Sequence, residues 1–302
     1  MTELSFSIII VSLNGQPRIH MPLDAMRQCR DFNGEVIVVD NGSKDGLSEF
    51  VREHYPEVKL ITSPKNLGFA GGNNLGILNA RGQILVLLND DTEPRPDWLI
   101  PLDREFRANP RLGIAGCKLL YPDQQTIQHL GGTITRNGLT NHLDYGLHES
   151  QQTVLTPREC DYVTGAAFAF RRGLVRDVGM LDPRFWPIYF EETDYCVRAK
   201  RAGWSIQVIP DSVVIHHESQ TTVRFSYRFM YMYHKNRMRF LLKNNFGLDL
   251  LRVLREEARW LSGNAPWDHF KPLAHAYGET VLNLPEIWKT RRQSKRQHAA
   301  RG

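Results

Sequence analysis

The chain has 302 residues, of which 41% are hydrophobic and 24% are charged, and its net charge is +5. This composition excludes an intrinsically disordered or fibrous protein, because it supplies enough apolar side chains for a sizeable core. The four cysteines form no Cys-x-x-Cys pair, so we expect neither a zinc site nor a disulfide scaffold, and a reducing, cytoplasmic location. The longest apolar runs are about five residues, against about 18 for a bilayer span, so no signal peptide or membrane span is expected.

Positive charge is concentrated near the end of the sequence. Residues 224–248 and 289–302 each carry six Lys or Arg and no acidic residue, whereas residues 1–223 have a net charge of −5. This distribution excludes a basic nucleic-acid-binding domain, so no nucleic-acid partner is expected. Both basic segments are interpreted either as solvated surface or as a contact with an anionic membrane surface.

Four apolar runs in the first third predict buried strands, at residues 6–11, 35–39, 58–61 and 83–88. Helical patterns lie between them, which is typical of a mostly parallel, Rossmann-like sheet flanked by helices, an α/β fold. Further along, we expect a helix from 191 to about 202, a strand over 211–215 and an aromatic-rich helix over 224–245. The sequence thus predicts a catalytic domain at 1–223, a C-terminal helical extension at 224–288 and a disordered basic tail at 289–302.

Polar residues follow each of the four predicted strands. The list in chain order is Ser12 and Asn14, then Asp40, then Lys65, Asn66, Gly71 and Asn73, then Asn89, Asp90 and Asp91. Because ligands bind at the carboxyl ends of strands in such a sheet, these residues predict a cleft for a polar, phosphorylated ligand. A nicotinamide dinucleotide is excluded, since the turn after the first strand contains only Gly15 instead of a Gly-x-Gly-x-x-Gly motif.

Seven motifs together resemble those of family 2 glycosyltransferases with the GT-A fold, close to the bacterial rhamnosyltransferase-like members. They are Ile-Val-Ser-Leu-Asn at 10–14, Val-Val-Asp-Asn-Gly-Ser at 38–43, Asn-Leu-Gly-Phe-Ala-Gly-Gly-Asn-Asn at 66–74, Leu-Asn-Asp-Asp at 88–91, Thr-Gly-Ala-Ala-Phe at 164–168, Phe-Glu-Glu-Thr-Asp-Tyr-Cys at 190–196 and His-His-Glu-Ser at 216–219. The resemblance covers residues 5–240. It implies an inverting glycosyltransferase that moves a sugar, for which rhamnose is a candidate, from a nucleoside-diphosphate donor to a glycan or lipid-linked acceptor in bacterial cell-wall polysaccharide or lipopolysaccharide synthesis.

The resemblance also implies roles in donor binding. Asp40 would accept hydrogen bonds from the base, with Ser12 and Asn14 nearby, although a turn-forming Asp at this place is the alternative. Residues 68–76 are interpreted as a glycine-rich loop that approaches the ligand, and Lys65 could reach a phosphate or the base. Gly165 would leave room for the sugar.

Asn89-Asp90-Asp91 matches the family's Asp-x-Asp motif, with Asn in the first place, and Asp91 takes the position expected to bind the metal. Carboxylate oxygens suit a hard cation such as Mg²⁺ or Mn²⁺, which leaves coordination positions for the two phosphates. His216 is expected to complete the metal shell. It is preferred to His217 because it precedes Ser219 with the family's His-x-x-Ser spacing.

The general base is expected among Glu191, Glu192 and Asp194, at the start of the predicted helix. Helical spacing places Glu191 and Asp194 on one face and turns Glu192 about 100° away, so the three cannot all face the sugar. The family motif assigns the role to Glu192, with Asp194 and Glu191 as alternatives. Acidic residues also favour the first helical turn for electrostatic reasons alone.

Two other functions are compatible with part of the sequence, namely a nucleotidyltransferase and a non-catalytic sugar-nucleotide binder. The first lacks the expected basic phosphate loop after the first strand, and the second would leave its acidic motifs without a role. The basic tail and the cationic aromatic helix further suggest that the protein works peripherally on the inner face of the cell membrane.

Overall fold

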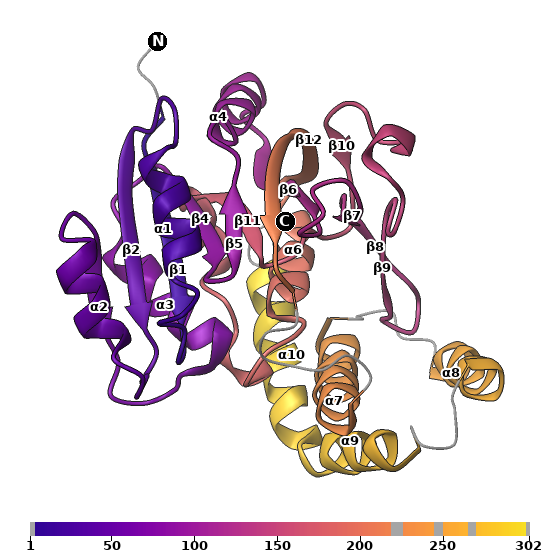
Figure 1. Ribbon diagram of the computed structural model, residues 1–302. Helices are drawn as coiled ribbons and strands as arrows, with labels where there is room; N and C mark the ends of the chain where they lie inside the picture. Colours follow the sequence, from indigo (N-terminus) through magenta and orange to yellow (C-terminus); the bar gives the residue numbers. More distant parts are fainter. Residues whose placement is uncertain (1–3, 219–225, 245–249, 265–269, 300–302) are drawn as a thin grey trace.

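The computed structural model describes residues 4–218, 226–244, 250–264 and 270–299 (Figure 1). The strands are β1 (Phe6–Ser12), β2 (Gly34–Asp40), β3 (Lys59–Thr62), β4 (Ile84–Asn89), β5 (Thr92–Pro94), β6 (Leu112–Leu120), β7 (Ile127–His129), β8 (Gly132–Ile134), β9 (Thr140–His142), β10 (Arg158–Glu159), β11 (Ala167–Arg171) and β12 (Ser205–His216). The helices are α1 (His20–Arg27), α2 (Leu47–His54), α3 (Gly68–Asn79), α4 (Leu99–Ala108), α5 (Arg172–Val178), α6 (Glu191–Arg201), α7 (Tyr227–Asn244), α8 (Leu250–Asn264), α9 (Phe270–Leu282) and α10 (Leu284–Ala299), with short 3-10 turns η1 (Glu149–Gln151) and η2 (Pro183–Phe185).

The central sheet runs in the order β10-β12-β6-β11-β4-β1-β2-β3, with β5 paired to β12 and β7 paired to β6. Its β4-β1-β2-β3 side is parallel, as expected, and the four predicted strands are confirmed within one residue at each end. The sheet as a whole is mixed rather than mostly parallel, because β11 lies antiparallel to both β4 and β6. The parallel side brings the carboxyl ends of β1, β2 and β4 to one edge.

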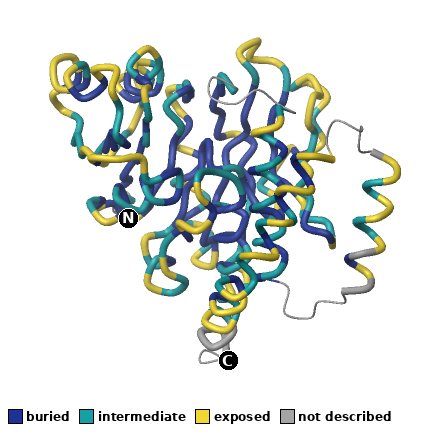
Figure 2. Tube along the Cα trace, turned by 90° about the horizontal axis from the view of Figure 1, so that it is seen from below, coloured by how far each residue is buried: buried dark blue, intermediate teal, exposed yellow. Residues whose placement is uncertain are grey.

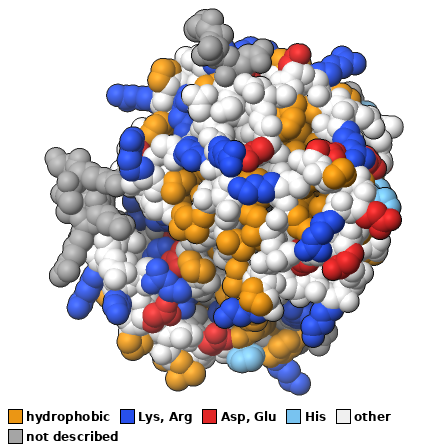
Figure 3. Space-filling view, turned by 90° about the vertical axis from the view of Figure 1, so that its left-hand side faces the viewer, with side chains coloured by type: hydrophobic (Ala, Val, Ile, Leu, Met, Phe, Trp, Pro, Cys, Tyr) orange, Lys and Arg blue, Asp and Glu red, His pale blue; other side chains and the backbone are white. Residues whose placement is uncertain are grey.

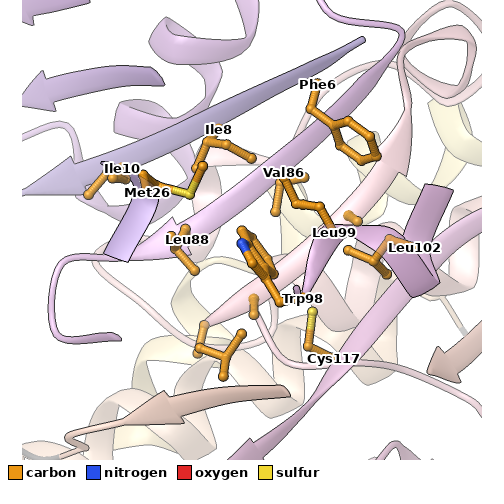
Figure 4. Packing of buried hydrophobic residues seen from close by; sticks show 14 of the residues in the cluster. Phe6, Ile8, Ile10, Met26, Val86, Leu88, Trp98, Leu99, Leu102 and Cys117 are labelled. Atoms are coloured by element: carbon orange, nitrogen blue, oxygen red, sulfur yellow. The ribbon is translucent and has the colours of Figure 1, made fainter. Parts of the chain in front are cut away.

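Two hydrophobic layers cover the sheet because side chains alternate along each strand. On one face, Ile8 and Ile10 of β1 pack with residues of α1, α2 and α4. Figure 4 shows part of this layer around Trp98, with Met26 of α1 and Leu99 of α4. On the other face, Ile9 packs with residues of α3, α5 and α6. Almost all of these strand residues are fully buried, which Figure 2 shows as a dark core through the middle of the molecule. Such a core fixes the strand ends that carry the polar residues.

The segment that we expected to be a glycine-rich loop is the helix α3, which corrects that prediction. A Cβ on Gly72 would lie 2.6 Å from Val11 Cγ1, and one on Gly76 would lie 2.3 Å from Ile9 Cγ2. These glycines therefore allow α3 to pack closely on β1. Of the residues 68–76, only Phe69 lines the cleft described below.

The C-terminal extension consists of helices. Its first helix, α7, contacts α6 of the catalytic part as well as α9 and α10. Asn236 of α7 is fully buried and donates to the carbonyl oxygens of Phe185 and Ile188 at 2.5 and 2.9 Å. Arg237, also fully buried, forms an ion pair with Glu257 of α8. The aromatic-rich helix is thus confirmed, and it contributes to the core. The expected domain boundary at 223 lies outside the described residues.

The basic segment after Trp288 was expected to be disordered, and the structure corrects this as far as Ala299. Residues 284–299 form α10, whose Arg291 donates to the carbonyl oxygen of Leu242 at 3.2 Å. The first half of α10 packs on α7, and such tertiary packing stabilises a helix. A charged sequence alone does not reveal this contact. No helix in the described ranges is long and apolar enough to span a bilayer.

Asp194 anchors α6 to α7 through a buried ion-pair network. Its carboxylate accepts from Arg198 Nε at 2.8 Å, Lys243 Nζ at 2.9 Å and Asn244 Nδ2 at 2.7 Å, and its side chain is fully buried. Lys243 also binds Asp182 at 2.7 Å. Burial acts to raise the pKa of Asp194, but the charges of Lys243 and Arg198 hold it below its ordinary value.

Asp194→Asn is expected to lower the free energy of unfolding by about 3–5 kcal/mol, because it removes the counter-charge of Arg198 and one of the two carboxylates that neutralise the buried Lys243. Urea denaturation at neutral pH measures this loss. The matched control is Asp211→Asn, which removes an exposed ion pair with Arg104 and should change stability little. A loss in Asp194→Asn no larger than in the control would show that the network does not stabilise the α6–α7 junction.

Candidate active site

A cleft of about 180 Å³ opens where β4, α6 and β12 meet. Its lining combines acidic, aromatic and small residues, namely Phe69, Asn89, Asp91, Thr164, Gly165, Ala166, Ile188, Tyr189, Glu191, Glu192, His216, Glu218 and Phe229. Six of the predicted site residues therefore share one cavity, although they come from distant parts of the sequence. These are Asn89, Asp91, Gly165, Glu191, Glu192 and His216.

Asp91 and His216 face each other across this cleft. Asp91 Oδ1 is buried, accepts no hydrogen bond from the described residues, and lies 3.3 Å from His216 Nε2. Asn89 Nδ2 lies 3.3 Å from the same nitrogen. The pairing of β12 with β5, in which His216 is opposite Thr92, places the histidine beside the Asp-containing turn.

His217 points away from the cleft that His216 lines. His217 Nε2 lies 2.8 Å from Glu93 Oε1, and neither residue lines the cleft. Side chains alternate along an extended chain, so consecutive histidines face opposite sides. Ser219, which defines the motif spacing, lies outside the described residues.

The charge of the cleft suits a divalent cation. Four carboxylates line it, those of Asp91, Glu191, Glu192 and Glu218, and no Lys or Arg is among its described lining residues. Asp91 and His216 offer one oxygen and one nitrogen ligand to a cation. No cluster of three or more such side chains with metal-site geometry occurs among the described residues.

Glu191 and Glu192 begin α6, directly after Phe190 in a left-handed conformation with φ of 73°. Glu191 is 1% exposed, and neither of its carboxylate oxygens has a hydrogen-bond partner among the described residues. Burial and the neighbouring Glu192 raise the pKa of Glu191 well above its ordinary value. Glu192 is half-buried, and burial raises its pKa to about 7.

The expectation that Glu191 groups with Asp194 on one face, with Glu192 turned away, is corrected by this geometry. Glu191 and Glu192 both line the cleft, whereas Asp194 lies in the buried network with Arg198 and Lys243. Asp194 is directed toward α7, because Lys243 and Asn244 of that helix donate to its carboxylate. Asp194 therefore lies outside the cleft.

Asp90 points away from Asp91 and joins the end of β4 to the end of β1. Its Oδ2 accepts from Ser12 Oγ at 2.5 Å and from Arg18 Nη2 at 2.9 Å. Burial raises the pKa of Asp90, although Ser12 and Arg18 oppose that change. Gly15 is required here, because a Cβ would lie 2.0 Å from Ser12 Oγ.

Asp40 and Asn14 shape the turn after β2. Asp40 accepts from Ser43 N at 2.8 Å and from Ser48 Oγ at 2.5 Å, which is the turn-forming arrangement weighed above. Burial acts to raise the pKa of Asp40, but these hydrogen bonds hold it below its ordinary value. Asn14 Oδ1 accepts from Lys44 N at 2.9 Å. Neither side chain lines the cleft.

The remaining predicted donor-binding residues lie around the start of α3. Lys65 and Asn66 are exposed, and Asn66 Oδ1 accepts from Gly68 N at 2.7 Å. Asn73 Nδ2 donates to the carbonyl oxygen of Phe69 at 2.9 Å within the helix, and Gly71 lies beside Leu67. Gly165 lies against Phe69, whose ring would be 2.7 Å from an added Cβ. Of these predicted residues, only Gly165 lines the cleft.

No sequence motif predicted two polar residues that lie near the site. Arg18 is the counter-charge of Asp90, and Gln128 of β7 accepts from His216 Nδ1 at 2.6 Å. Gln128 lies in a three-residue strand whose position depends on its pairing with β6. Neither residue belongs to a spacing motif, so only the tertiary structure reveals them.

Comparisons with known proteins agree with this architecture. The chain is 33% identical over 196 residues to the uncharacterized protein y4gI of Sinorhizobium fredii, and 28% identical over 223 residues to the O-antigen biosynthesis protein RfbC of Myxococcus xanthus. These matches cover 62% and 70% of this chain, but the chain spans only about a fifth of those relatives, 21% and 17%. It is 23% identical over 270 residues to an N-acetylglucosaminyl-diphospho-decaprenol L-rhamnosyltransferase of Mycobacterium tuberculosis, covering 80% of this chain and 85% of the relative.

Solved structures show the same fold. The structure of GalNAc-T7 with UDP, GalNAc and Mn²⁺ has a TM-score of 0.67 at 17% identity, covering 94% of this chain and 58% of that one. The mannosyltransferase PcManGT of Pyrobaculum calidifontis, in complex with GDP-Man and Mn²⁺, has a TM-score of 0.56 at 20% identity, covering 100% of this chain and 77% of that one.

The sequence match to a family model identifies the chain more directly than the shared fold does. Residues 7–179, more than half of the chain, match the model of glycosyl transferase family 2. This range contains the strands β1 to β4 and the part of the cleft lining that comes from Phe69, Asn89, Asp91 and residues 164–166. The chain therefore belongs to glycosyl transferase family 2.

Proposed function

We propose that the protein is an inverting, metal-dependent hexosyltransferase. It moves a sugar from a nucleoside-diphosphate donor to a glycan or lipid-linked acceptor in bacterial cell-surface polysaccharide synthesis. The observation that carries the proposal is the acidic cleft, in which Asp91 and His216 face each other next to Glu191 and Glu192. The names of the Myxococcus and Mycobacterium relatives support a polysaccharide or lipid-linked acceptor and make rhamnose the first sugar to test.

Asp91 and His216 would hold Mg²⁺ or Mn²⁺, since the buried Asp91 Oδ1 and the histidine nitrogen point at the same space. The cation would supply Lewis-acid stabilisation of the charge that develops on the departing diphosphate. The described lining has no Lys or Arg that could take over this task. Two of the solved neighbours contain Mn²⁺, which favours the same class of ion.

Glu192 would act as the general base. Its pKa of about 7 lets it be deprotonated near neutral pH and still accept a proton. It removes the proton of the acceptor hydroxyl, whose oxygen attacks the anomeric carbon while the bond from that carbon to the diphosphate oxygen breaks on the opposite side. The apolar walls formed by Phe69, Tyr189 and Phe229 would orient the sugar and keep water away.

A thermal-shift screen of nucleotide sugars with and without Mn²⁺ tests this function, because a ligand that binds only the folded state raises its melting temperature. We expect a shift with one nucleotide sugar that grows when Mn²⁺ is added. Release of nucleoside diphosphate in the presence of acceptor then establishes transfer. Release of pyrophosphate would instead indicate a nucleotidyltransferase, and binding without any release would indicate a non-catalytic binder.

We also propose that the corner between α9 and α10 contacts an anionic membrane surface on the cytoplasmic side. Leu282, Val281 and Trp288 are 82%, 62% and 48% exposed there, next to the exposed cations Lys289 and Arg292. Exposed Leu and Trp beside Lys and Arg is typical of an interfacial helix, and each cation near anionic lipid contributes about 1 kcal/mol. Figure 2 shows the last helix extending from the body of the molecule. Figure 3 shows a different face, at the left-hand side of Figure 1, where basic side chains also lie among apolar ones.

Leu282→Glu is expected to reduce co-sedimentation with phosphatidylglycerol-containing vesicles severalfold at low salt, because a carboxylate replaces an apolar contact with the bilayer. The matched control is Leu155→Glu, which makes the same charge change at a 69% exposed site in another part of the fold. Equal partitioning of the two variants and the wild type would contradict the membrane contact.

A further inference from the structure

Gln128 is a buried residue that contacts two residues of the cleft lining, His216 and Glu218. It is 3% exposed in β7, between the edge of β6 and the cleft. Its side-chain Oε1 lies 2.6 Å from His216 Nδ1, and its Nε2 lies 3.1 Å from Glu218 Oε2. Its carbonyl oxygen lies 3.0 Å from His142 Nδ1 of β9. Both the backbone and the side chain of Gln128 are therefore held in place.

The carboxylate of Glu218 determines which way the amide of Gln128 points. An ionised carboxylate only accepts hydrogen bonds, so the amide NH₂ must face Glu218 and the amide oxygen must face His216. The reverse orientation would place the amide oxygen against the carboxylate, so that two acceptors would face each other. The burial of Gln128 makes such an unpaired arrangement costly.

The orientation of Gln128 in turn selects the tautomer of His216. The amide oxygen can only accept, so Nδ1 of the neutral imidazole carries the proton and donates it to Gln128 at 2.6 Å. Nε2 then keeps its lone pair. That lone pair points toward the space between His216 and Asp91 Oδ1, where Asn89 Nδ2 also approaches to 3.3 Å.

We infer that Gln128 is a positioning residue, which holds His216 so that its Nε2 lone pair and Asp91 Oδ1 together receive a divalent cation. The inference rests on the proposed metal-dependent function and deepens it. Outer hydrogen bonds of this kind fix the ring orientation of a ligating histidine, and their loss typically weakens metal affinity by about 10- to 100-fold. Glu218 acts through Gln128 as the group that orients the amide.

The test compares the full-length wild type with Gln128→Met, which keeps the side-chain length but removes both hydrogen bonds. Mn²⁺ alone is titrated and its binding followed by electron paramagnetic resonance. The ¹⁵N spectrum of the metal-free protein, with His216 assigned by comparison with His216→Gln, reports which ring nitrogen carries the proton. We expect the Nδ1–H tautomer in the wild type, its loss in Gln128→Met, and Mn²⁺ affinity weaker by about 10- to 100-fold.

The control that separates positioning from folding is the double substitution Gln128→Glu/Glu218→Gln. It exchanges the carboxylate and the amide, so the net charge and both hydrogen bonds are kept, and a group that only accepts still faces His216 Nδ1. We expect it to restore the Nδ1–H tautomer and Mn²⁺ affinity to within about threefold of the wild type, far inside the 10- to 100-fold loss.

Three outcomes would overturn the inference: an Nδ1–H tautomer retained in Gln128→Met, a changed tautomer with unchanged Mn²⁺ affinity, or a double variant as weak as Gln128→Met. A wild type that binds no Mn²⁺ would instead contradict the metal role in the proposed function. The tautomer spectra, recorded without metal, would still show whether Gln128 orients His216.

Discussion

Asp91→Ala is expected to abolish the effect of Mn²⁺ on donor binding and to reduce transfer by about three orders of magnitude or more. Lewis-acid stabilisation of the leaving group contributes several kcal/mol, and each 1.36 kcal/mol corresponds to about tenfold in rate. The fold should persist, because Asp91 Oδ1 accepts no hydrogen bond from the described residues and its removal leaves no donor there unpaired. Isothermal titration with the nucleotide-sugar donor, with and without Mn²⁺, measures the coupling.

The control for Asp91→Ala is Glu93→Ala, two residues along the chain. Glu93 binds His217 at 2.8 Å and does not line the cleft, so its loss should leave the Mn²⁺ dependence unchanged. Metal dependence lost in Glu93→Ala but kept in Asp91→Ala would assign the cation to the other histidine. Equal donor affinity of the wild type with and without Mn²⁺ would eliminate the metal role itself.

Glu192→Gln is expected to bind the donor normally and to lose about 10²- to 10⁴-fold in kcat, which is the usual contribution of a general base. Because the pKa of Glu192 is raised to about 7 by burial, the base is increasingly protonated below that pH. The wild-type rate should therefore fall about tenfold per pH unit well below 7 and level off above it. The residual rate of Glu192→Gln should show no such step, and steady-state kinetics from pH 5 to 9 provide the test.

Glu191→Gln is the matched control, since Glu191 precedes Glu192 and lines the same cleft. Burial and the neighbouring Glu192 raise the pKa of Glu191 well above its ordinary value, so both favour the neutral form of this carboxyl, which an amide imitates. A smaller loss than in Glu192→Gln is expected. If Glu191→Gln shows the larger loss and removes the pH step, Glu191 is the base.

The strands and the polar residues after them could be predicted because the signal is local. A buried parallel strand requires a run of apolar side chains, and residues 6–11 and 84–88 consist almost entirely of them. The sheet then places the ends of such strands together, so Asn89 and Asp91 could be assigned to a cleft before any contact was known. The start of α6 at Glu191 was also predicted from sequence alone.

Glycine-rich and charged segments were predicted less well, because their conformation depends on what they pack against. Residues 68–76 have the composition of a loop, yet they form α3, since Gly72 and Gly76 allow the helix to approach β1. The basic segment after Trp288 is helical as far as Ala299, and α10 packs on α7. A segment that is flexible and a segment that packs closely on a neighbouring element can therefore have the same amino-acid composition.

The sequence by itself determined the family, the strands β1 to β4 and the residue types that follow them, since these depend on local runs and motifs. Only the tertiary structure decided which of the carboxylates line the cleft. Asp194 is neutralised by Lys243, Asp90 is bound by Ser12 and Arg18, and Asp91 and Glu192 line the cleft. The physical reason is that the state of a carboxylate depends on burial and on the donors around it, and those donors lie far away in the sequence, as Arg18 does from Asp90 at a separation of 72 residues.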